Sequence, residues 1–183
     1  EIEIVYEGDR EALAGTGARY AVLIANQNYG EGSQLARLET PFADVDALAE
    51  LLTTRYGYVT EATFDGRTIP LVLKDPSAAQ MADLLYRVSE FAGEADSVLI
   101  YYAGHGIYEQ ATGAAFWVPV NARYGYPPSY YDPDLLSKDL SRIKAGNVLV
   151  ISDSCYSGQL LRGADGPAGA MDDDRMLALQ RLS

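Results

Sequence analysis

Short apolar runs alternate along the chain with segments whose apolar residues recur at helical spacing. The predicted strands are Tyr20–Ala25, Tyr58–Phe64, Ser97–Ala103, Ala115–Val120 and Asn147–Ser152. Helical spacing predicts one helix from Val45 that stops at Gly57, and a second that begins after the N-cap Ser77 and ends near Gly93. A third helix is expected over Leu135–Ile143.

This alternation of buried strands and amphipathic helices, repeated at intervals of about 30 residues, is typical of β-α-β units. We therefore expect an α/β fold: a three-layer sandwich with a mainly parallel central sheet and helices on both faces. The Tyr/Pro/Gly-rich segment Arg123–Pro133 predicts a loop. No apolar run approaches the length of about 18 residues that a membrane-spanning helix needs.

Three segments are expected along the chain. Residues 1–18 predict an N-terminal arm or edge strand, and residues 19–162 predict the main domain. Residues 163–183 begin with a Gly/Ala-rich stretch that predicts a flexible linker. Because a three-layer sheet ordinarily continues past this point, we expect a C-terminal part that is missing here or forms a separate chain.

Composition restricts the binding partners and the cellular location that we expect. The 183 residues carry a formal net charge of −12, so an electrostatic nucleic-acid surface is not expected. The chain has one cysteine and therefore no internal disulfide, which predicts a reducing, cytoplasmic location. It also has one histidine, so chemistry that needs both imidazole and thiol must use His105 and Cys155.

These two residues come just after two predicted strands. His105 lies between Gly104 and Gly106, after the strand Ser97–Ala103, and Cys155 follows the strand Asn147–Ser152. Ligands of parallel sheets bind at the carboxyl ends of strands, so this placement favours a Cys–His pair for nucleophilic catalysis. The alternative interpretation is a small buried cysteine and a polar loop histidine. A structural zinc site would need more such ligands than this.

At these positions the sequence resembles the caspase-like cysteine peptidases (clan CD, peptidase C14), in their metacaspase and bacterial orthocaspase branch. The motifs are Tyr101–Gly106 (YYAGHG) and Asp153–Gly158 (DSCYSG). Arg19–Asn26 also resembles the first strand of that family, and Pro41–Leu52 resembles its first helix. The resemblance implies a caspase-like fold, with residues 19–162 forming the large-subunit part of a catalytic domain.

The resemblance also implies roles for individual residues. Cys155 would be the nucleophile of an endopeptidase, and His105 would be its acid–base partner. The backbone N–H groups of Gly106 and Cys155 would form the oxyanion hole. Asp153 and Asp44 match positions in the S1 pocket, and two carboxylates there favour Arg or Lys at P1.

Alternatives remain open for the S1 pocket. Asp44 is equally explained as an acidic residue that stabilises a helix N-terminus, and the nearby Asp46 competes with it for the pocket role. Arg19 resembles an S1 arginine of aspartate-specific caspases, which would favour Asp at P1 instead of Arg or Lys. We give Asp153 more weight than Arg19.

Several positions depart from the family pattern. Tyr156 stands where many metacaspases have His, and Ala103 replaces a pocket Ser of some relatives. The calcium-binding positions of metacaspases correspond to Arg162 and Asn121, so no metal or other cofactor is expected. The remaining acidic candidates for calcium are interpreted as a solvated surface; they are Asp132, Asp134 and Asp172–Asp174.

The resemblance further implies maturation and partners. Self-cleavage at Arg175 or Arg181 is the hypothesis for activation, because both follow the expected linker. The expected partners are a peptide or protein substrate with basic P1 and a small-subunit-like C-terminal part or regulatory protein, with no nucleic acid or membrane. The alternative is a caspase-like scaffold that binds partners without cleaving them. An unrelated hydrolase or nucleotide-binding domain ranks last, since G-x-S-x-G and G-x-G-x-x-G motifs are absent.

Overall fold

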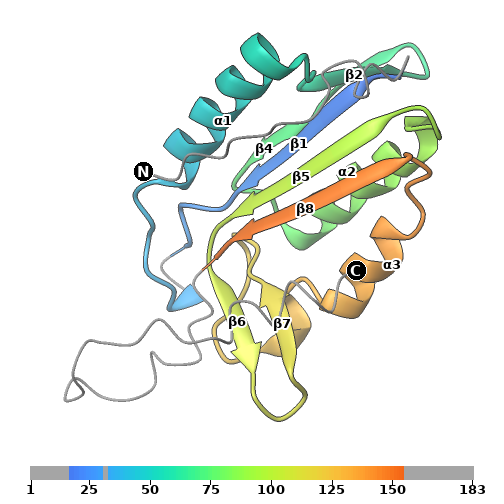
Figure 1. Ribbon diagram of the computed structural model, residues 1–183. Coiled ribbons are helices and arrows are strands. Elements are labelled where there is room, and N and C mark those ends of the chain that lie inside the picture. Colours follow the sequence, from blue (N-terminus) through green and yellow to red (C-terminus); the bar gives the residue numbers. More distant parts are fainter. Residues whose placement is uncertain (1–16, 31–32, 155–183) are drawn as a thin grey trace, which may run out of the picture.

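A parallel four-stranded sheet in the order β4-β1-β5-β8 lies at the centre of the computed structural model, which describes residues 17–30 and 33–154 (Figure 1). The elements are β1 (Arg19–Ala25), α1 (Pro41–Tyr56), β2 (Glu61–Phe64), β3 (Arg67–Pro70), β4 (Val72–Lys74), α2 (Ala78–Phe91), β5 (Ser97–Ala103), β6 (Gly106–Glu109), β7 (Ala114–Trp117), η2 (Pro127–Ser129), α3 (Pro133–Leu140) and β8 (Asn147–Asp153). The predicted α/β class is confirmed.

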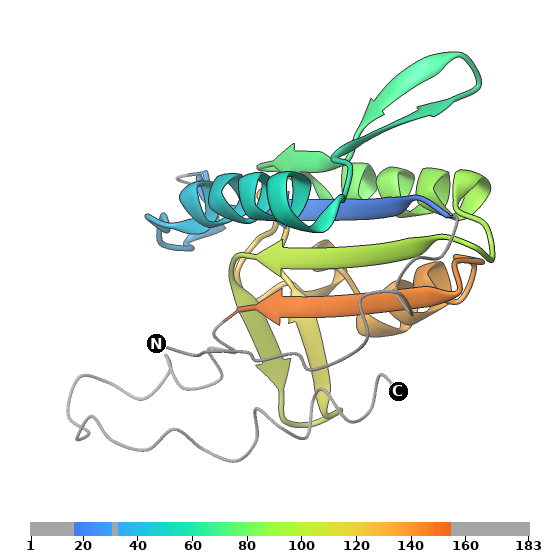
Figure 2. The same cartoon turned by 45° about the horizontal axis from the view of Figure 1, so that its top comes forward.

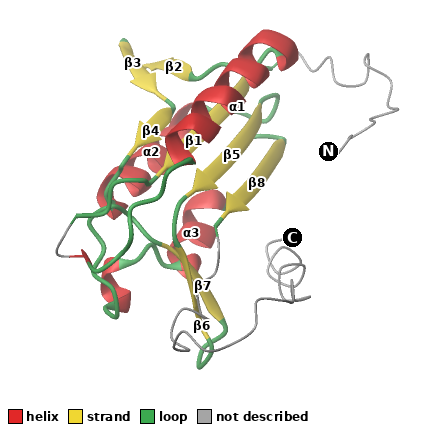
Figure 3. Ribbon diagram, turned by 90° about the vertical axis from the view of Figure 1, so that its left-hand side faces the viewer, coloured by secondary structure: helices red, strands yellow, loops and turns green. Residues whose placement is uncertain are grey.

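Helices cover both faces of this sheet, as predicted (Figure 3). Side chains that alternate along β1 point to opposite faces, because successive residues of a strand do so. Leu23 packs in a cluster with Val45 and Leu52 of α1. Val22 and Ile24 belong to a second cluster that includes residues of α2 and α3. The strands are therefore buried between two apolar layers.

The helix boundaries follow from local signals that the sequence contains. Helix α1 ends at Gly57, whose φ of 68° is the left-handed conformation that glycine adopts without steric cost. Helix α2 begins with a capping box, in which the Ser77 hydroxyl accepts from the Gln80 backbone N–H and the Gln80 side chain binds back to Ser77. Both predicted helices are confirmed at these ends.

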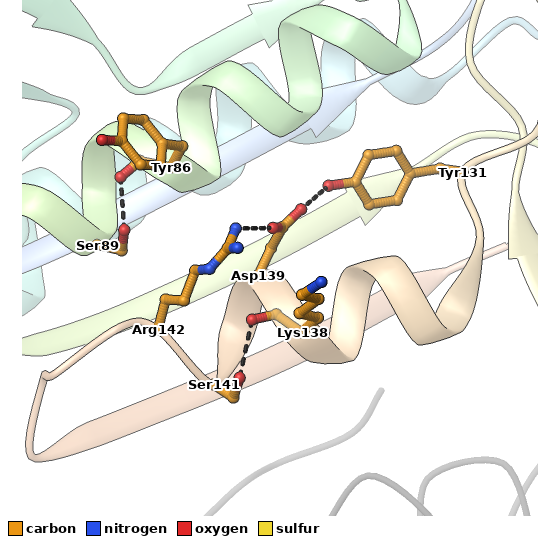
Figure 4. Close-up of polar contacts among 7 residues, drawn as sticks. All are labelled: Tyr86, Ser89, Tyr131, Lys138, Asp139, Ser141 and Arg142. Atoms are coloured by element: carbon orange, nitrogen blue, oxygen red, sulfur yellow. Dashed lines mark hydrogen bonds and ion pairs between the residues drawn. The ribbon is translucent and has the colours of Figure 1, made fainter.

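A buried carboxylate anchors helix α3, which is shorter than the predicted Leu135–Ile143 (Figure 4). Asp139 accepts hydrogen bonds from the Tyr131 hydroxyl at 2.7 Å and from the Arg142 guanidinium at 3.0 Å. Burial and this carboxylate both raise the pKa of Tyr131. The helix is capped by Asp132, whose Oδ1 accepts from the backbone N–H of Asp134. Asp132 thus has a structural role that needs no cation.

Two predicted strands form most of their pairs outside the main sheet. The predicted Tyr58–Phe64 is reduced to β2, which pairs with β3 in an antiparallel hairpin. The predicted Ala115–Val120 is reduced to β7, which pairs with β6 in a second hairpin. Figure 2 shows these hairpins projecting from opposite ends of the sheet. Val59 of the predicted Tyr58–Phe64 still forms one parallel bridge with Tyr20 of β1, and beyond it pairing across a short turn replaces pairing with the main sheet. Strands β3 and β4 were not predicted.

The burial of β8 also differs from the prediction of a fully covered apolar strand. Within the described residues β8 is an edge strand, with β5 as its neighbour. Val148, Leu149 and Ile151 are exposed, and Leu149 retains 54% of its accessible surface. The apolar sequence is that of an internal strand, yet the described chain supplies no strand beyond it.

The arm in residues 1–16 and the segment 163–183 lie outside the described residues, as does Cys155. The described boundary positions Gly17 and Ala18 lead into β1, where Ser97 N–H donates to the Ala18 carbonyl. Within the described ranges, no helix has the length and apolar character that crossing a bilayer requires. The predicted boundaries at residues 18 and 162 stay predictions.

Candidate active site

A pocket of about 180 Å³ lies at the carboxyl ends of β5 and β8. Its lining combines the start of α1 and the preceding loop with the ends of both strands: Leu38, Glu39, Thr40, Pro41, Asp44, Ala103, Gly104, His105 and Asp153. Ala103 and Asp153 are directly opposite each other in the parallel register of β5 and β8. The topology thus brings together His105, Asp44 and Asp153, three of the residues singled out in the sequence.

Two tyrosine hydroxyls hold the backbone of His105. The Tyr29 hydroxyl accepts a hydrogen bond from the His105 backbone N–H at 2.9 Å, and its ring lies 4.7 Å from the imidazole. The Tyr102 hydroxyl lies 2.9 Å from the His105 carbonyl and 3.0 Å from the Val118 carbonyl, and its proton can be donated to either oxygen. Both polar groups of the His105 backbone are therefore held by side chains from strand β5 and from the loop after β1.

Glycine is required at position 104 by the same hydroxyls. A Cβ atom there would lie 2.5 Å from the Tyr102 hydroxyl oxygen and 3.0 Å from the Tyr29 hydroxyl oxygen. Neither hydroxyl is free to move, because each is hydrogen-bonded to the His105 and Val118 backbone. The glycine before His105 therefore allows the close approach that fixes the histidine backbone.

Burial keeps both tyrosines neutral. It raises the pKa of Tyr29 to about 12, and the hydrogen bond from the His105 backbone opposes this rise only in part. The pKa of the fully buried Tyr102 is raised well above its usual value by burial and by the neighbouring Tyr29. Each hydroxyl thus keeps its proton near neutral pH and acts as both donor and acceptor.

The imidazole of His105 is oriented by a backbone carbonyl. Its Nε2 atom lies 2.8 Å from the Ala36 oxygen, in the segment between β1 and α1. Because a carbonyl oxygen only accepts, this contact requires the proton on Nε2 and leaves the lone pair of the neutral ring on Nδ1. A ring in this state can take up a proton at Nδ1.

Carboxylates give the pocket its charge. Asp153 accepts a hydrogen bond from the Tyr101 hydroxyl at 3.1 Å. Burial, the charge and hydrogen bond of Asp153, and the charge of Asp44 all raise the pKa of Tyr101. Both carboxylates therefore lie close to this tyrosine, on one side of the pocket.

The two other candidates for the S1 pocket, Asp46 and Arg19, do not line it. Asp46, two residues after the pocket residue Asp44 in α1, forms an ion pair with Lys74 at 2.7 Å. Arg19 starts β1 at the opposite end of the sheet, where its guanidinium donates to the Tyr56 carbonyl at 2.9 Å. Of the two acids near the start of α1, only Asp44 lines the pocket, and Arg19 does not line it.

Two further parts of the site escaped the sequence analysis. Glu39 is a third acidic residue in the pocket lining, and the Ala36 carbonyl orients His105. Glu39 lies in an irregular segment without periodic pattern, and a backbone oxygen has no residue-type signal. Thr40 precedes α1 without a side-chain capping hydrogen bond, and Pro41 occupies the first turn of that helix.

The end of β8 is held one residue before Cys155. Ser154 is buried, and its hydroxyl lies 3.0 Å from that of Ser152. The Trp117 indole N–H donates to the Ser152 hydroxyl at 3.0 Å. Gly106, expected in the oxyanion hole, begins β6 directly after His105, opposite Trp117. Within residues 17–30 and 33–154, no three His, Cys, Asp or Glu side chains are grouped closely enough to bind a metal ion.

The parallel sheet, its two helical layers and the histidine at the end of β5 define a caspase-type α/β domain. The chain belongs to the caspase domain family of peptidases, whose family model matches residues 18–178. Among curated protein sequences, none matches the chain.

Solved structures share the fold. Caspase-1 from Spodoptera frugiperda is 15% identical with a TM-score of 0.58, over 85% of this chain and 54% of that one. Protein GSU0716 from Geobacter sulfurreducens is 21% identical with a TM-score of 0.58, over 77% of this chain and 52% of that one. The chain thus spans about half the length of these two structures.

Proposed function

We propose that this chain is the large-subunit part of a cysteine endopeptidase of the metacaspase type, in which Cys155 is the nucleophile and His105 the acid–base residue. The observation that carries the proposal is the pocket in which His105 meets Asp44 and Asp153, at the end of the strand that leads to Cys155. A tautomer-fixed imidazole beside an acidic pocket suits the cleavage of a peptide after a basic residue.

The register of the sheet supports the Cys–His pair. Ala103 and Asp153 are paired in adjacent parallel strands, and His105 and Cys155 each follow this pair by two positions. Adjacent strands lie about 4.8 Å apart, so the chain leaves the sheet at neighbouring points on both sides.

In the proposed reaction the Cys155 thiol transfers its proton to Nδ1 of His105, and the thiolate attacks the scissile carbonyl carbon. The resulting oxyanion is stabilised by the N–H groups that the family resemblance assigns to Gly106 and Cys155. The imidazolium then donates its proton to the leaving amine as the C–N bond breaks. Water, deprotonated by the same imidazole, hydrolyses the acyl-enzyme and restores the thiol.

The three carboxylates of the pocket favour a basic P1 side chain. Asp44, Asp153 and Glu39 line a space of about 180 Å³, which suits an extended arginine or lysine side chain. Asp153 already accepts a hydrogen bond from Tyr101, which fixes its orientation. A guanidinium would form charge-assisted hydrogen bonds with these oxygens, whereas an aspartate at P1 would be repelled.

A small-subunit-like C-terminal part is proposed as the partner of β8. The exposed Val148, Leu149 and Ile151 give this edge strand an apolar surface that a further strand and its covering layer would bury.

The cysteine count favours a reducing, cytoplasmic location. No step of the proposed reaction requires a metal or other cofactor, so activity should persist in excess EDTA.

The primary test compares fluorogenic peptides with Arg, Lys or Asp at P1, using the full-length protein that contains this chain. We expect cleavage after Arg and Lys, and its complete loss in Cys155→Ala. The scaffold alternative predicts binding of partners with no turnover in either protein. Cleavage after Asp alone would contradict the assignment of the acidic pocket while leaving the cysteine peptidase intact.

Specificity provides a second test with a matched control. Asp153→Asn should lower kcat/KM for the Arg substrate by about 10- to 100-fold, because it removes one charged partner of the guanidinium. Asp46→Asn, on the same helix as Asp44 but paired with Lys74 outside the pocket, should leave kcat/KM unchanged. Equal effects of the two substitutions would indicate general electrostatics instead of a P1 contact.

Self-cleavage at Arg175 or Arg181 is proposed as the maturation step, and both residues lie outside the described part. Intact-mass analysis of the wild type should show shortening under active conditions, and Cys155→Ala should keep its full mass. Unshortened wild-type protein with full peptidase activity would reject this step alone.

A further inference from the structure

The carbonyl that orients His105 belongs to a loop with its own hydrogen-bonded support. Ala36 is exposed and lies between β1 and α1, so no strand or helix fixes its oxygen. The Nε2 atom of His105 nevertheless lies 2.8 Å from this oxygen. The tautomer of the imidazole therefore depends on whatever holds the loop in place.

Asp75 is the centre of that support. It follows β4 with a φ of 53°, a left-handed conformation that is uncommon for residues other than glycine. Its Oδ1 atom accepts from the backbone N–H groups of Gln27 at 2.7 Å and Asn28 at 3.0 Å. Its Oδ2 atom accepts from the side-chain amide of Asn28 at 2.7 Å. One carboxylate thus fixes the chain as it leaves β1.

Asn28 connects Asp75 to the loop that contains Ala36. Its Oδ1 atom accepts from Nε of Arg37 at 2.9 Å, and Arg37 is the residue next to Ala36. A second tie joins the same two stretches, because the Leu38 backbone N–H donates to the Gln27 carbonyl at 3.1 Å. The contacts run without a gap from Asp75 through Asn28 and Arg37 to the Ala36 carbonyl.

We propose that Asp75 is a positioning residue for the peptidase reaction: through Asn28 and Arg37 it holds the Ala36 carbonyl, which keeps the proton of neutral His105 on Nε2. This inference rests on the proposed function, since the free Nδ1 atom is the one that accepts the thiol proton. Without the carbonyl, the neutral ring would distribute its proton between both nitrogens and rotate, and fewer molecules would be ready to react.

The single histidine of the chain makes the tautomer directly measurable. Imidazole ¹⁵N NMR at about pH 8, above the usual pKa of histidine, reports one residue without assignment. We expect the wild type to show the Nε2–H tautomer. Asp75→Ala and Arg37→Ala should show a mixture of tautomers, together with a roughly 10-fold lower kcat and an unchanged KM for the Arg substrate.

Two matched variants sharpen the test. Asp65→Ala removes an aspartate that also has positive φ, 50°, in the turn between β2 and β3, and it should change neither tautomer nor kcat. Asp75→Asn alone should impair both, because two amide N–H₂ groups then face each other. Adding Asn28→Asp exchanges the amide and the carboxylate, which restores a donor and an acceptor at this contact and should recover the wild-type tautomer.

The outcomes separate this inference from the proposed function. A tautomer change in a protein that cleaves no peptide would keep the support of His105 and reject the peptidase. An active enzyme whose tautomer is unchanged in Asp75→Ala and Arg37→Ala would overturn the inference, as would a loss of kcat without a tautomer change. If Asp75→Ala does not fold, Arg37→Ala decides, because that side chain is exposed.

Discussion

Strands β5 and β8 are neighbours with similar apolar sequences, yet they differ in how the fold supports them. β5 lies between β1 and β8, and six of its seven residues are buried. β8 is the edge of the described sheet, and none of its residues is fully buried. The residues two positions beyond the strand ends differ accordingly: His105 is held by Tyr29, Tyr102 and Ala36, whereas Cys155 follows an incompletely covered strand.

This contrast indicates that the two strand ends depend on different contacts for their final geometry. His105, the proposed general base, is held by contacts within the described residues. Strand β8, which leads to the proposed nucleophile, has exposed apolar side chains, so we expect its final geometry to depend on what covers it. We therefore expect a peptidase in which His105 is already oriented by the large-subunit part, while the position of Cys155 depends on the C-terminal part that covers β8.

The largest effect is expected from removing His105, the proposed base at the end of β5. His105→Ala should lower kcat for the Arg substrate by about 10²- to 10⁴-fold, because the thiol loses its proton acceptor and the leaving amine its proton donor. KM should change little, because in the proposed pocket the substrate side chain would contact the carboxylates instead of His105. Steady-state kinetics measure both constants, and an unaltered thermal unfolding profile is the control for the fold.

A wild-type kcat in His105→Ala would contradict the dyad. A fall in kcat accompanied by a large rise in KM would instead place His105 among the residues that bind the substrate in the ground state.

A matched pair of leucines tests the difference in burial between the strands. Leu99 of β5 and Leu149 of β8 are directly paired in the sheet, with 6% and 54% of their surfaces exposed. Leu99→Ala should lower the free energy of unfolding by about 3 kcal/mol, because it leaves a cavity beneath α1. Leu149→Ala should cost less than about 0.5 kcal/mol in this chain, measured by urea unfolding.

The same pair sharpens the proposal about the C-terminal part. In the full-length protein, a covering layer would bury Leu149, and Leu149→Ala should then approach the cost of Leu99→Ala. An equally small cost in both proteins would show that β8 remains an exposed edge.

The sequence predicted those parts of the fold that have a local signal. The capping box at Ser77 and the glycine at position 57 mark helix ends by their own chemistry, and both helices begin or end there. The long apolar runs of β1 and β5 predicted buried parallel strands. Asp44 and Asp153 were placed by motif position, and the pocket contains both.

The remaining features of the fold and the site depend on contacts that cannot be predicted from residue types. Periodicity does not state whether Ala114–Trp117 pairs with the main sheet or with its sequence neighbour. The three-residue β4 is too short for any pattern. The Ala36 carbonyl is a backbone atom, and an aspartate before a proline, such as Asp75, predicts only a turn. Such parts of a site follow from the folded arrangement.

The last prediction concerns the tyrosines that hold His105 and is tested at alkaline pH. The pKa of Tyr29 is about 12 in the folded protein, against about 10 for an unfolded tyrosine. Below pH 10 both states keep the proton, so Tyr29 ionisation does not affect stability. Between pH 10 and 12 only the unfolded state ionises, so stability falls as pH rises. Over this window Tyr29→Phe should lose about 2 to 3 kcal/mol less stability than the wild type, as measured by urea unfolding at each pH. Parallel losses in the two proteins would contradict the burial of this hydroxyl, and with it the support of His105 that distinguishes the end of β5 from the end of β8.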